Sequence, residues 1–265
     1  MKKFLLLVTL ICVGIGGVYS QQMKPWFGKQ CAVVLTYDDA IDQHLDNAIP
    51  VLDSLGLKAT FYLSAFSSSM QNRMDAWKKL AVKGHELGNH TLYHPCAGGP
   101  GREWVRKEYD LNTYTVKRIE DEIRMTNLFL NSLDGKKERS FAFTCGEMKV
   151  GDSSFMDGLK KDFVAARAVR KQIHTIDQVD LYNVDCYAVN GETGEQLIEW
   201  VKKAQQSGGL LVILFHGVGG GNALNVSVEA HRTFLRYLKQ HENEIWVTPM
   251  ITAAKYIQEW QKGHH

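Results

Sequence analysis

The sequence predicts an α/β protein in which about seven strand–helix units form a barrel close to the TIM-barrel type. Short apolar, β-branched segments alternate along the chain with segments of helical periodicity. No repeat and no long linker divides the 265 residues, 45% of which are hydrophobic, so one sizeable core is expected. An open, doubly wound sheet is the alternative. Neither G-x-G-x-x-G after the first strand nor G-x-x-x-x-G-K-[ST] occurs, which argues against dinucleotide and nucleotide binding.

Each predicted strand is a short apolar segment bounded by turn residues or polar positions. The run 210–215 gives the strongest signal because it is continuously apolar, as in a strand buried on both faces. Residues 181–184 give the weakest signal. In chain order, the predicted strands are Cys31–Leu35, Lys58–Leu63, Gly84–His90, Arg139–Thr144, Phe163–Arg167, Leu181–Val184, Leu210–Phe215 and Ile245–Val247.

The segments between the strands carry apolar residues at helical spacing. Gly56 is expected to end the first helix, and Pro50 to make its early part irregular. In chain order, the predicted helices cover residues 41–55, 70–82, 103–132, 194–206, 228–240 and 250–260.

The first residues have the composition of a secretion signal. Two lysines precede the apolar run Phe4–Val18, and a plausible cleavage site lies before Gln21. The apolar run is too short and too rich in glycine for a membrane span. We therefore expect a signal peptide at 1–20, one catalytic domain at 21–265, and a secreted or periplasmic protein.

Charge and cysteine content exclude some classes of partner. Removal of the signal takes two lysines from 31 basic residues and leaves 29, which equals the number of acidic residues. A nearly neutral chain gives no reason to expect nucleic acid as a partner. The four remaining cysteines, Cys31, Cys96, Cys145 and Cys186, allow three disulfide pairings, and the sequence does not choose among them. None forms a C-x-x-C pair, which argues against a thiolate zinc site.

Two adjacent carboxylates, Asp38 and Asp39, stand where the first predicted strand stops. Two acids at the tip of a buried strand are costly to desolvate unless a positive charge lies beside them. A metal ion supplies such a charge, and it allows one acid to be a ligand while the other acts as a base. The competing interpretation is an Asp pair that caps the next helix.

Two imidazoles, His90 and His94, lie four positions apart just after a short strand. On a helical turn these positions share a face, so both rings can reach one ion. Together with Asp39 they make a His/His/carboxylate set with open positions, which is typical of a catalytic metal. Thr91 stands where the H-E-x-x-H metalloproteases have their glutamate, so a zincin is disfavoured. Two polar loop histidines are the competing interpretation.

His216 follows the strongest predicted strand and is itself followed by a glycine-rich loop. A histidine at such a strand tip suits a general acid. The competing interpretation is a core histidine with its hydrogen bonds satisfied. Its location favours the acid, because Asp38, Asp39 and His90 also fall at the carboxyl ends of predicted strands, where barrel active sites are built.

The residues at these strand ends resemble the motifs of the polysaccharide deacetylases, carbohydrate esterase family four with its NodB-like domain. Residues 36–40, T-Y-D-D-A, resemble the family motif T-F-D-D-G. Residues 90–94 match H-[ST]-x-x-H, and residues 214–216 match L-x-H. The order and the spacing agree, and the resemblance spans about residues 31–255.

The resemblance implies a distorted (β/α)7 barrel that hydrolyses acetyl groups on an oligo- or polysaccharide with a divalent metal ion, usually Zn²⁺. The roles that it implies for single residues are as follows: Asp38 the general base, His216 the general acid, Asp39, His90 and His94 the metal ligands, and Leu214 a wall of the pocket for the acetyl methyl group.

The third family motif, R-P-P-Y-G, departs most, because residues 142–146 read A-F-T-C-G. In the family, the arginine orients the base and the tyrosine N–H helps to bind the oxyanion. The N–H of Cys145 can still donate, but no arginine matches, and Arg139 is near only in sequence. In the weak fourth motif, Asp185 is the candidate for orienting His216. Ala40 replaces the usual glycine after the metal-binding aspartate.

Other candidate residues are less clearly assigned. We expect His44 and His231 on helix surfaces or in support of the site. The aromatic rings of Tyr93, Trp104 and Tyr109 flank the loop after the metal histidines, where they either line a sugar-binding groove or pack on a helix.

Three functions from different classes are compatible with these features. The first is a metal-dependent carbohydrate deacetylase, acting on N-acetyl groups or, as an esterase, on O-acetyl groups such as those of xylan. The second is a catalytically inactive carbohydrate-binding relative, which the altered third motif favours. The third is a metallopeptidase or amidohydrolase, which Thr91 disfavours.

Overall fold

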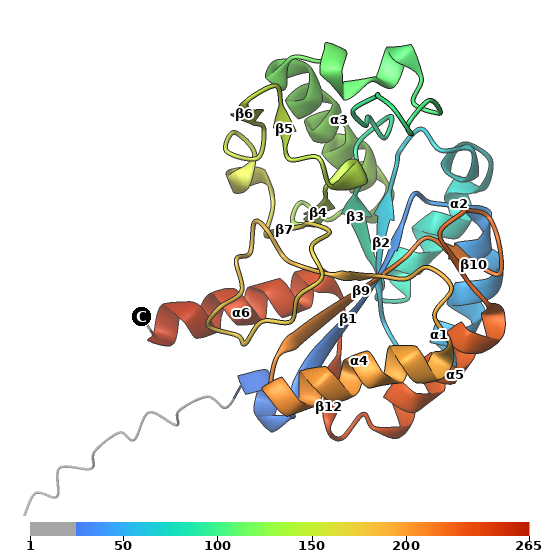
Figure 1. The fold of residues 1–265 in the computed structure, drawn as a ribbon, viewed down its shortest axis with the longest axis vertical. Coiled ribbons are helices and arrows are strands. Elements are labelled where there is room, and N and C mark those ends of the chain that lie inside the picture. The colour runs from blue at the N-terminus through green and yellow to red at the C-terminus, as the bar shows by residue number, and fades with distance from the viewer. Residues whose placement is uncertain (1–24, 265) are drawn as a thin grey trace, which may run out of the picture.

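The computed structural model describes residues 25–264, and the predicted signal peptide at 1–20 lies outside this range. Parallel strands gather at the centre of the molecule and helices surround them (Figure 1). The strand order is β7-β4-β3-β2-β1-β9-β8, and β12 also pairs with β1. The strands of this sheet are β1 (Cys31–Asp38), β2 (Thr60–Leu63), β3 (Glu86–Asn89), β4 (Ser140–Ala142), β7 (Ala165–Arg167), β8 (Tyr187–Ala188), β9 (Leu210–Phe215) and β12 (Ile245–Val247).

The sheet curls into a distorted barrel, as the sequence predicts. Backbone bonds join β7 to the segment before β8, where Val184 N donates to Ala166 O at 2.9 Å and Ala168 N donates to Val184 O at 2.8 Å. β8 then pairs with β9. Of the weak strand predicted at 181–184, only Val184 forms a bridge, while the regular strand lies at Tyr187–Ala188.

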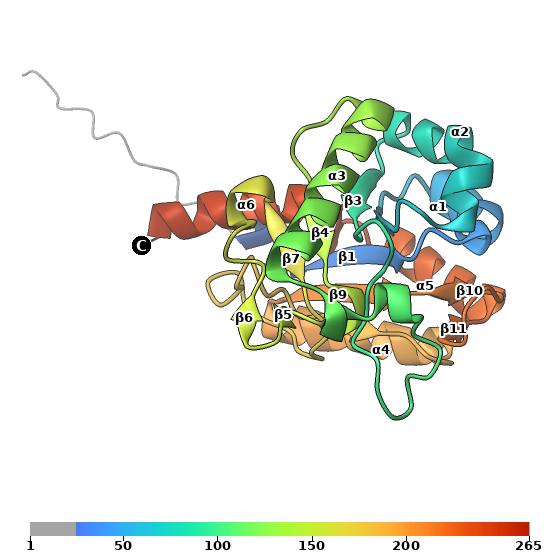
Figure 2. The same ribbon diagram turned by 90° about the horizontal axis from the view of Figure 1, so that it is seen from above.

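Helices cover the outside of the barrel, and Figure 2 shows β1 and β9 between α2 and α3 on one side and α4 on the other. A π-helical turn, His44–Ala48, precedes α1, as expected of a helix with Pro50 in its first turn. The helices are α1 (Ile49–Leu55), α2 (Ser68–Val82), α3 (Val116–Asp134), α4 (Gly194–Ser207), α5 (Val228–Gln240) and α6 (Met250–His264). Two small strand pairs lie outside the barrel: β5 (Lys149–Val150) with β6 (Ser153–Ser154), and β10 (Gly217–Val218) with β11 (Asn225–Val226).

The predicted helix at 103–132 is wrong in its first half, because α3 begins at Val116. Thr115 caps it, and its hydroxyl accepts a hydrogen bond from Arg118 N at 3.1 Å. Before the cap, the carboxylate of Asp110 accepts from Gly98 N at 2.9 Å and from Asn112 N at 3.0 Å. These side-chain bonds hold the preceding residues in a loop although their apolar spacing is helical.

Alternation along β1 divides its side chains between two environments. Val33, Leu35 and Tyr37 pack in the cluster that includes residues of α1, α2, α4 and α5. Ala32 and Val34 lie in the cluster that includes residues of α6. Because side chains of a strand alternate between its faces, Asp38 belongs with Ala32 and Val34 on the inner face of the barrel.

A buried polar cluster joins the strands at the end opposite to the tip of β1. Glu86 accepts hydrogen bonds from Ser140 N at 2.8 Å, from Thr60 Oγ1 at 2.7 Å and from Ile251 N at 2.9 Å. Arg139, only 1% exposed, pairs with Asp134 and donates to Leu87 O at 2.7 Å. The structure therefore gives Arg139 a structural place between α3 and β3.

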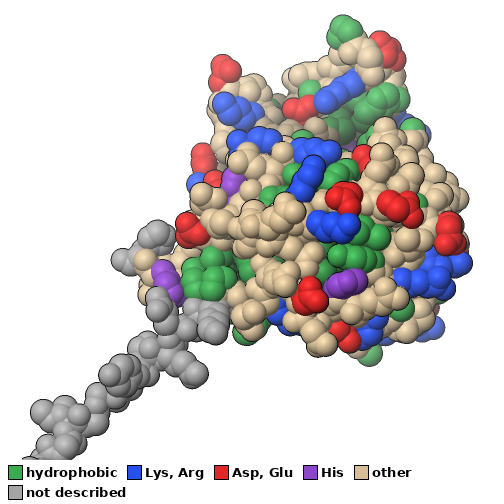
Figure 3. Space-filling view, turned by 60° about the horizontal axis from the view of Figure 1, so that its bottom comes forward, with side chains coloured by type: hydrophobic (Ala, Val, Ile, Leu, Met, Phe, Trp, Pro, Cys, Tyr) green, Lys and Arg blue, Asp and Glu red, His purple; other side chains and the backbone are tan. Residues whose placement is uncertain are grey.

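None of the helices within 25–264 is long and apolar enough to cross a membrane. On the face shown in Figure 3, basic and acidic side chains are interspersed. The part of that face drawn in colour shows no large patch of charged side chains of one sign.

His44 and His231 are fully buried, so of the two places expected for them, the helix surface is wrong for both. His231 Nε2 lies 2.8 Å from the hydroxyl of Tyr37, and His44 Nε2 lies 2.7 Å from the carbonyl oxygen of His216. Burial lowers the pKa of His44 to about 4 and that of His231 to about 3. Both rings are therefore neutral in the folded protein at pH 7.

This burial predicts acid lability. Both folded pKa values lie below the unfolded value of about 6.5, so the unfolded chain binds more protons as the pH falls. Stability is full above about pH 6.5 and is lost toward the folded pKa values. The change His231→Gln introduces a side chain that does not titrate. Between pH 7 and pH 5, the unfolding free energy of this variant should therefore fall by about 2 kcal/mol less than that of the wild type. Urea unfolding at both pH values measures it, and equal losses in variant and wild type would contradict the assignment.

Candidate active site

Backbone strain gathers at the carboxyl end of the barrel. Five non-glycine residues there adopt a positive φ, which is uncommon for residues with a side chain. Such strain often marks functional sites, where the surrounding structure holds it in place. The five are Asp39 (82°), Ala40 (55°), Thr91 (66°), His94 (55°) and Cys145 (53°). Ala40, where the family motif has glycine, thus keeps the left-handed conformation that glycine adopts freely.

Asp39, His90 and His94 meet at this end. Asp39 Oδ1 lies 3.5 Å from His90 Nε2 and 3.2 Å from His94 Nε2. Ligand atoms at about 2.1 Å from a tetrahedral zinc ion are about 3.4 Å apart, so the three atoms fit one ion. Asp39 Oδ1 is also buried without a hydrogen-bond partner in the described chain. The donor set therefore suits a divalent metal such as zinc.

Neighbouring groups orient these three side chains. His90 Nδ1 lies 2.9 Å from the carbonyl oxygen of Ala142, which leaves its Nε2 free for a ligand. Asn222 donates to Asp39 Oδ2 at 3.0 Å, so Oδ1 is the oxygen that faces the imidazoles. Burial alone would raise the pKa of Asp39, but the adjacent imidazoles of His90 and His94 and their positive charge hold it well below its usual range.

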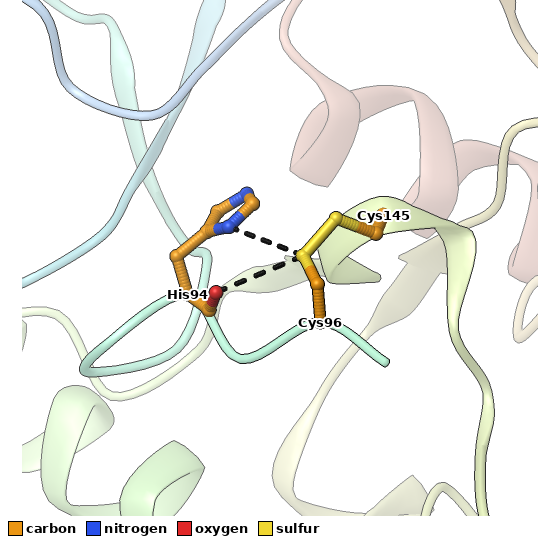
Figure 4. Close-up of side chains that lie close together, drawn as sticks. All are labelled: His94, Cys96 and Cys145. Carbon is orange, nitrogen blue, oxygen red and sulfur yellow. Dashed lines mark hydrogen bonds between the residues drawn. A yellow bond between two sulfur atoms is a disulfide. The ribbon is translucent and has the colours of Figure 1, made fainter. Parts of the chain in front are cut away.

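A disulfide joins Cys96 to Cys145 and answers the pairing that the sequence left open. Cys31 and Cys186 are free and buried. Figure 4 shows the bridge beside His94, whose Nδ1 lies 3.5 Å from Cys96 Sγ. A disulfide sulfur carries no proton, so any hydrogen bond here runs from the ring N–H to sulfur. The bridge thus connects the loop of a metal-site histidine to the residue expected to bind the oxyanion.

Asp38 projects toward the same site but makes a different contact. It is 2% exposed, and its Oδ2 accepts a hydrogen bond from the guanidinium of Arg167, which is 0% exposed. Its other oxygen, Oδ1, has no hydrogen-bond partner within residues 25–264. His90 Nε2 lies 3.7 Å from Oδ2, so the carboxylate stands beside the metal donors without being part of the closest group.

His216 lies at the tip of β9 and lines the cavity that also contains Asp38 and Asp39. Burial lowers its pKa, and the charges of Asp38 and Asp39 oppose that shift. Its Nδ1 has no hydrogen-bond partner in the described part of the chain.

The role predicted for Asp185, orienting His216, is wrong. Its carboxylate instead accepts hydrogen bonds from Arg170 at 2.7 Å and lies 2.7 Å from His174 Nε2. The neighbouring Cys186 projects to Arg167, at 3.6 Å. Because successive side chains of an extended segment point to opposite sides, Asp185 is turned away from the site.

A cavity of about 980 Å³ opens over these residues. Leu214 and Cys145, predicted to contact the substrate, both line it. Its outer wall is aromatic, with Tyr93 stacked on Tyr109 at 4.9 Å between ring centroids. Phe66 and Trp104 also line the cavity.

 Phe66 is 52% exposed and Trp104 is 63% exposed. Both rings therefore present open faces to whatever enters the cavity.

Sequence reasoning missed two residues that contact the carboxylates. Asn222 lies in the glycine-rich loop after β9, where no local pattern marks it. Arg167 did carry a signal, because it is a charged residue at the end of a predicted buried strand, like Asp38 and His90. The signal alone does not assign Arg167 to the site, because the resembling motif places its arginine on a different strand.

The fold and the site together define a barrel protein with a His/His/carboxylate centre at the carboxyl ends of its strands. A family model described as "Polysaccharide deacetylase" matches residues 28–154. This match places the segment 28–154, just under half of the chain, in the family whose motifs the sequence resembles, the NodB-like deacetylases of carbohydrate esterase family four.

Three similar proteins illustrate the relationship. YlxY of Bacillus subtilis is 27% identical over 139 residues, which are 52% of this chain and 36% of that protein. The peptidoglycan-N-acetylmuramic acid deacetylase PdaA of Bacillus subtilis is 24% identical over 114 residues, 43% of this chain and 37% of PdaA. The structure of the Bc1960 peptidoglycan N-acetylglucosamine deacetylase aligns with a TM-score of 0.57 at 19% identity, over 85% of this chain and 88% of that one. The matches to the two curated relatives thus span little more than a third of their length.

The disulfide yields a prediction about stability and metal affinity. The bridge closes a loop of 49 residues, so the change Cys96→Ala/Cys145→Ala should lower the unfolding free energy by about 4 kcal/mol. It should also weaken zinc binding on the order of tenfold, because His94 loses a neighbour that orients its ring. Denaturant unfolding and zinc titration measure the two effects. Cys31→Ala, which leaves the bridge intact, is the control, and unchanged zinc affinity in the double variant would contradict the orienting role.

Proposed function

We propose that this protein is a metal-dependent hydrolase that removes acetyl groups from a carbohydrate. The observation that carries the proposal is the convergence of Asp39, His90 and His94 on one point, with Asp38 and His216 lining the same cavity. A base and an acid beside a metal-type donor set are what hydrolysis of an acetyl amide or ester requires.

Each residue has a task in this proposal. Asp39, His90 and His94 would hold a divalent ion, which supplies Lewis-acid chemistry at the acetyl carbonyl. Asp38 accepts a proton from the attacking water through Oδ1, the oxygen that Arg167 does not bind. His216 donates a proton to the departing amine or alcohol. The N–H of Cys145 faces the developing negative charge, and Leu214 contacts the acetyl methyl group.

The cavity supports a glycan as the substrate. Sugar rings stack on aromatic faces, and Phe66, Tyr93, Trp104 and Tyr109 line one side of the opening. The relative PdaA is named for its action on an N-acetylated sugar of peptidoglycan, which supports N-acetyl groups as the first substrates to test. O-acetyl groups, such as those of xylan, are the alternative within the same chemistry.

A second candidate is a catalytically inactive carbohydrate-binding relative. The observation that favours it is the altered third motif, A-F-T-C-G at residues 142–146. Acetate release from a panel of N- and O-acetylated glycans, with added zinc, separates the two candidates. Binding without acetate release from any member would favour the inactive relative.

We further propose that the protein acts outside the cytoplasm, as a secreted or periplasmic enzyme. The predicted signal peptide lies outside the described residues, so the support comes from the Cys96–Cys145 disulfide. Disulfides persist in oxidising compartments and are rare in the cytosol.

The metal assignment predicts that the purified protein binds about one zinc ion per chain. Asp39→Ala and His94→Ala should each abolish binding, because each removes one of three protein ligands. Elemental analysis after dialysis measures the ion. Asp185→Asn, which changes a carboxylate turned away from the site, should keep it. Full retention of zinc in Asp39→Ala or His94→Ala would refute the ligand set.

The acid assignment predicts a dependence on the leaving group. His216→Ala should keep the ion but lower kcat on an N-acetyl glycan on the order of a hundredfold, the usual effect of losing a positioned acid. An activated aryl acetate needs little protonation of its leaving group, so its hydrolysis should fall much less. Equal losses on both substrates would show that His216 does not act as the acid.

A further inference from the structure

Arg167 is a fully buried cation in the interior of the barrel, at the end of β7. Its guanidinium contacts Asp38, donates to Ala168 O at 3.2 Å and lies 5.2 Å from the ring of Tyr62. Burial alone would lower the pKa of Arg167, but the charge of Asp38 opposes this and the pKa is raised. The arginine is therefore held as a cation against the carboxylate.

The contact leaves the two oxygens of Asp38 in different states. Oδ2 is bound by Arg167, whereas Oδ1 is buried and unpartnered within residues 25–264. A carboxylate held by one oxygen cannot rotate freely, so its other oxygen keeps one direction. This is the arrangement that a base needs in order to meet a water molecule at a set position.

The register of the sheet places Arg167 beside the altered third motif. β4 and β7 are parallel neighbours, and Ala142 is the partner of Arg167. In-register residues on adjacent strands project to the same face, about 4.8 Å apart. Ala142 is the position at which the resembling motif has its arginine, so a cation stands at the same level of the barrel, one strand away.

We propose that Arg167 is the residue that positions Asp38 as the base, and that it does so from β7 in place of an arginine on β4. The proposal rests on the proposed function of the site. It also makes Ala142 a permissive position, because a small side chain there leaves space for the guanidinium from the next strand.

The experiment transfers the arginine from position 167 on β7 to the neighbouring position 142 on β4. Arg167→Met should lower kcat roughly a hundredfold while KM changes little and zinc is retained, because the base is disordered but the ion and groove are intact. The double change Ala142→Arg/Arg167→Ala should recover at least tenfold of that loss, since the cation again meets Asp38. Thermal unfolding of these variants and of the single change Arg167→Ala gives a readout independent of activity, and the double variant should unfold at a higher temperature than Arg167→Ala.

Arg139→Met is the matched control. Arg139 is also buried and paired with an acid, Asp134, but it lies at the other end of the strands. Its loss should lower stability without changing kcat. A loss of kcat limited to the Arg167 variants supports positioning, whereas equal losses in both would reduce Arg167 to a structural role.

The outcomes separate this proposal from the function beneath it. A wild-type protein that releases no acetate contradicts the proposed function. An active wild type with an unchanged kcat in Arg167→Met contradicts only the role of the arginine. If Arg167→Met does not fold, the double variant decides: folded and active supports the proposal, and folded and inactive overturns it.

Discussion

A buried ion pair between Asp38 and Arg167 is the interaction on which the arrangement of the site depends. Either charge alone in the interior would be costly, because desolvation penalises each ion by several kcal/mol. β4, β3 and β2 stand between β7 and β1 in the strand order, so the pair spans the barrel and connects separate walls. Their mutual attraction offsets these costs only while the strands keep this separation. The pair therefore links the fold of the barrel to the direction of the carboxylate.

The loops around this pair hold strained backbone, and covalent and polar contacts keep it in place. Asp39, His94 and Cys145 all adopt a positive φ. Asn222 binds Asp39, and the Cys96–Cys145 bridge joins the other two loops. At the opposite end, Glu86 connects β2, β4 and α6 by accepting four hydrogen bonds from neutral donors. The polar cluster that stabilises the barrel and the residues of the candidate site thus lie at opposite ends of the strands.

Much of the fold was predictable because strand and helix signals are local. Seven of the predicted strands coincide with observed ones within a few residues, and the weak signal at 181–184 corresponds to a single bridge. The predicted helix at 103–132 failed in its first half because the carboxylate of Asp110 holds a loop against helical periodicity. The spacing of apolar residues shows which of them would share one face of a helix. It carries no information about hydrogen bonds from side chains to the backbone, such as those of Asp110.

The sequence by itself determined the metal-type set, because Asp39 directly follows a strand and His90 and His94 share one short loop. Tertiary structure alone decided the partner of Asp38, the pairing of Cys96 with Cys145, and the turning of Asp185 away from His216. Each of these depends on the register between strands that lie far apart in the chain. Register is set by packing across the whole barrel, so no local pattern reports which side chains it brings together.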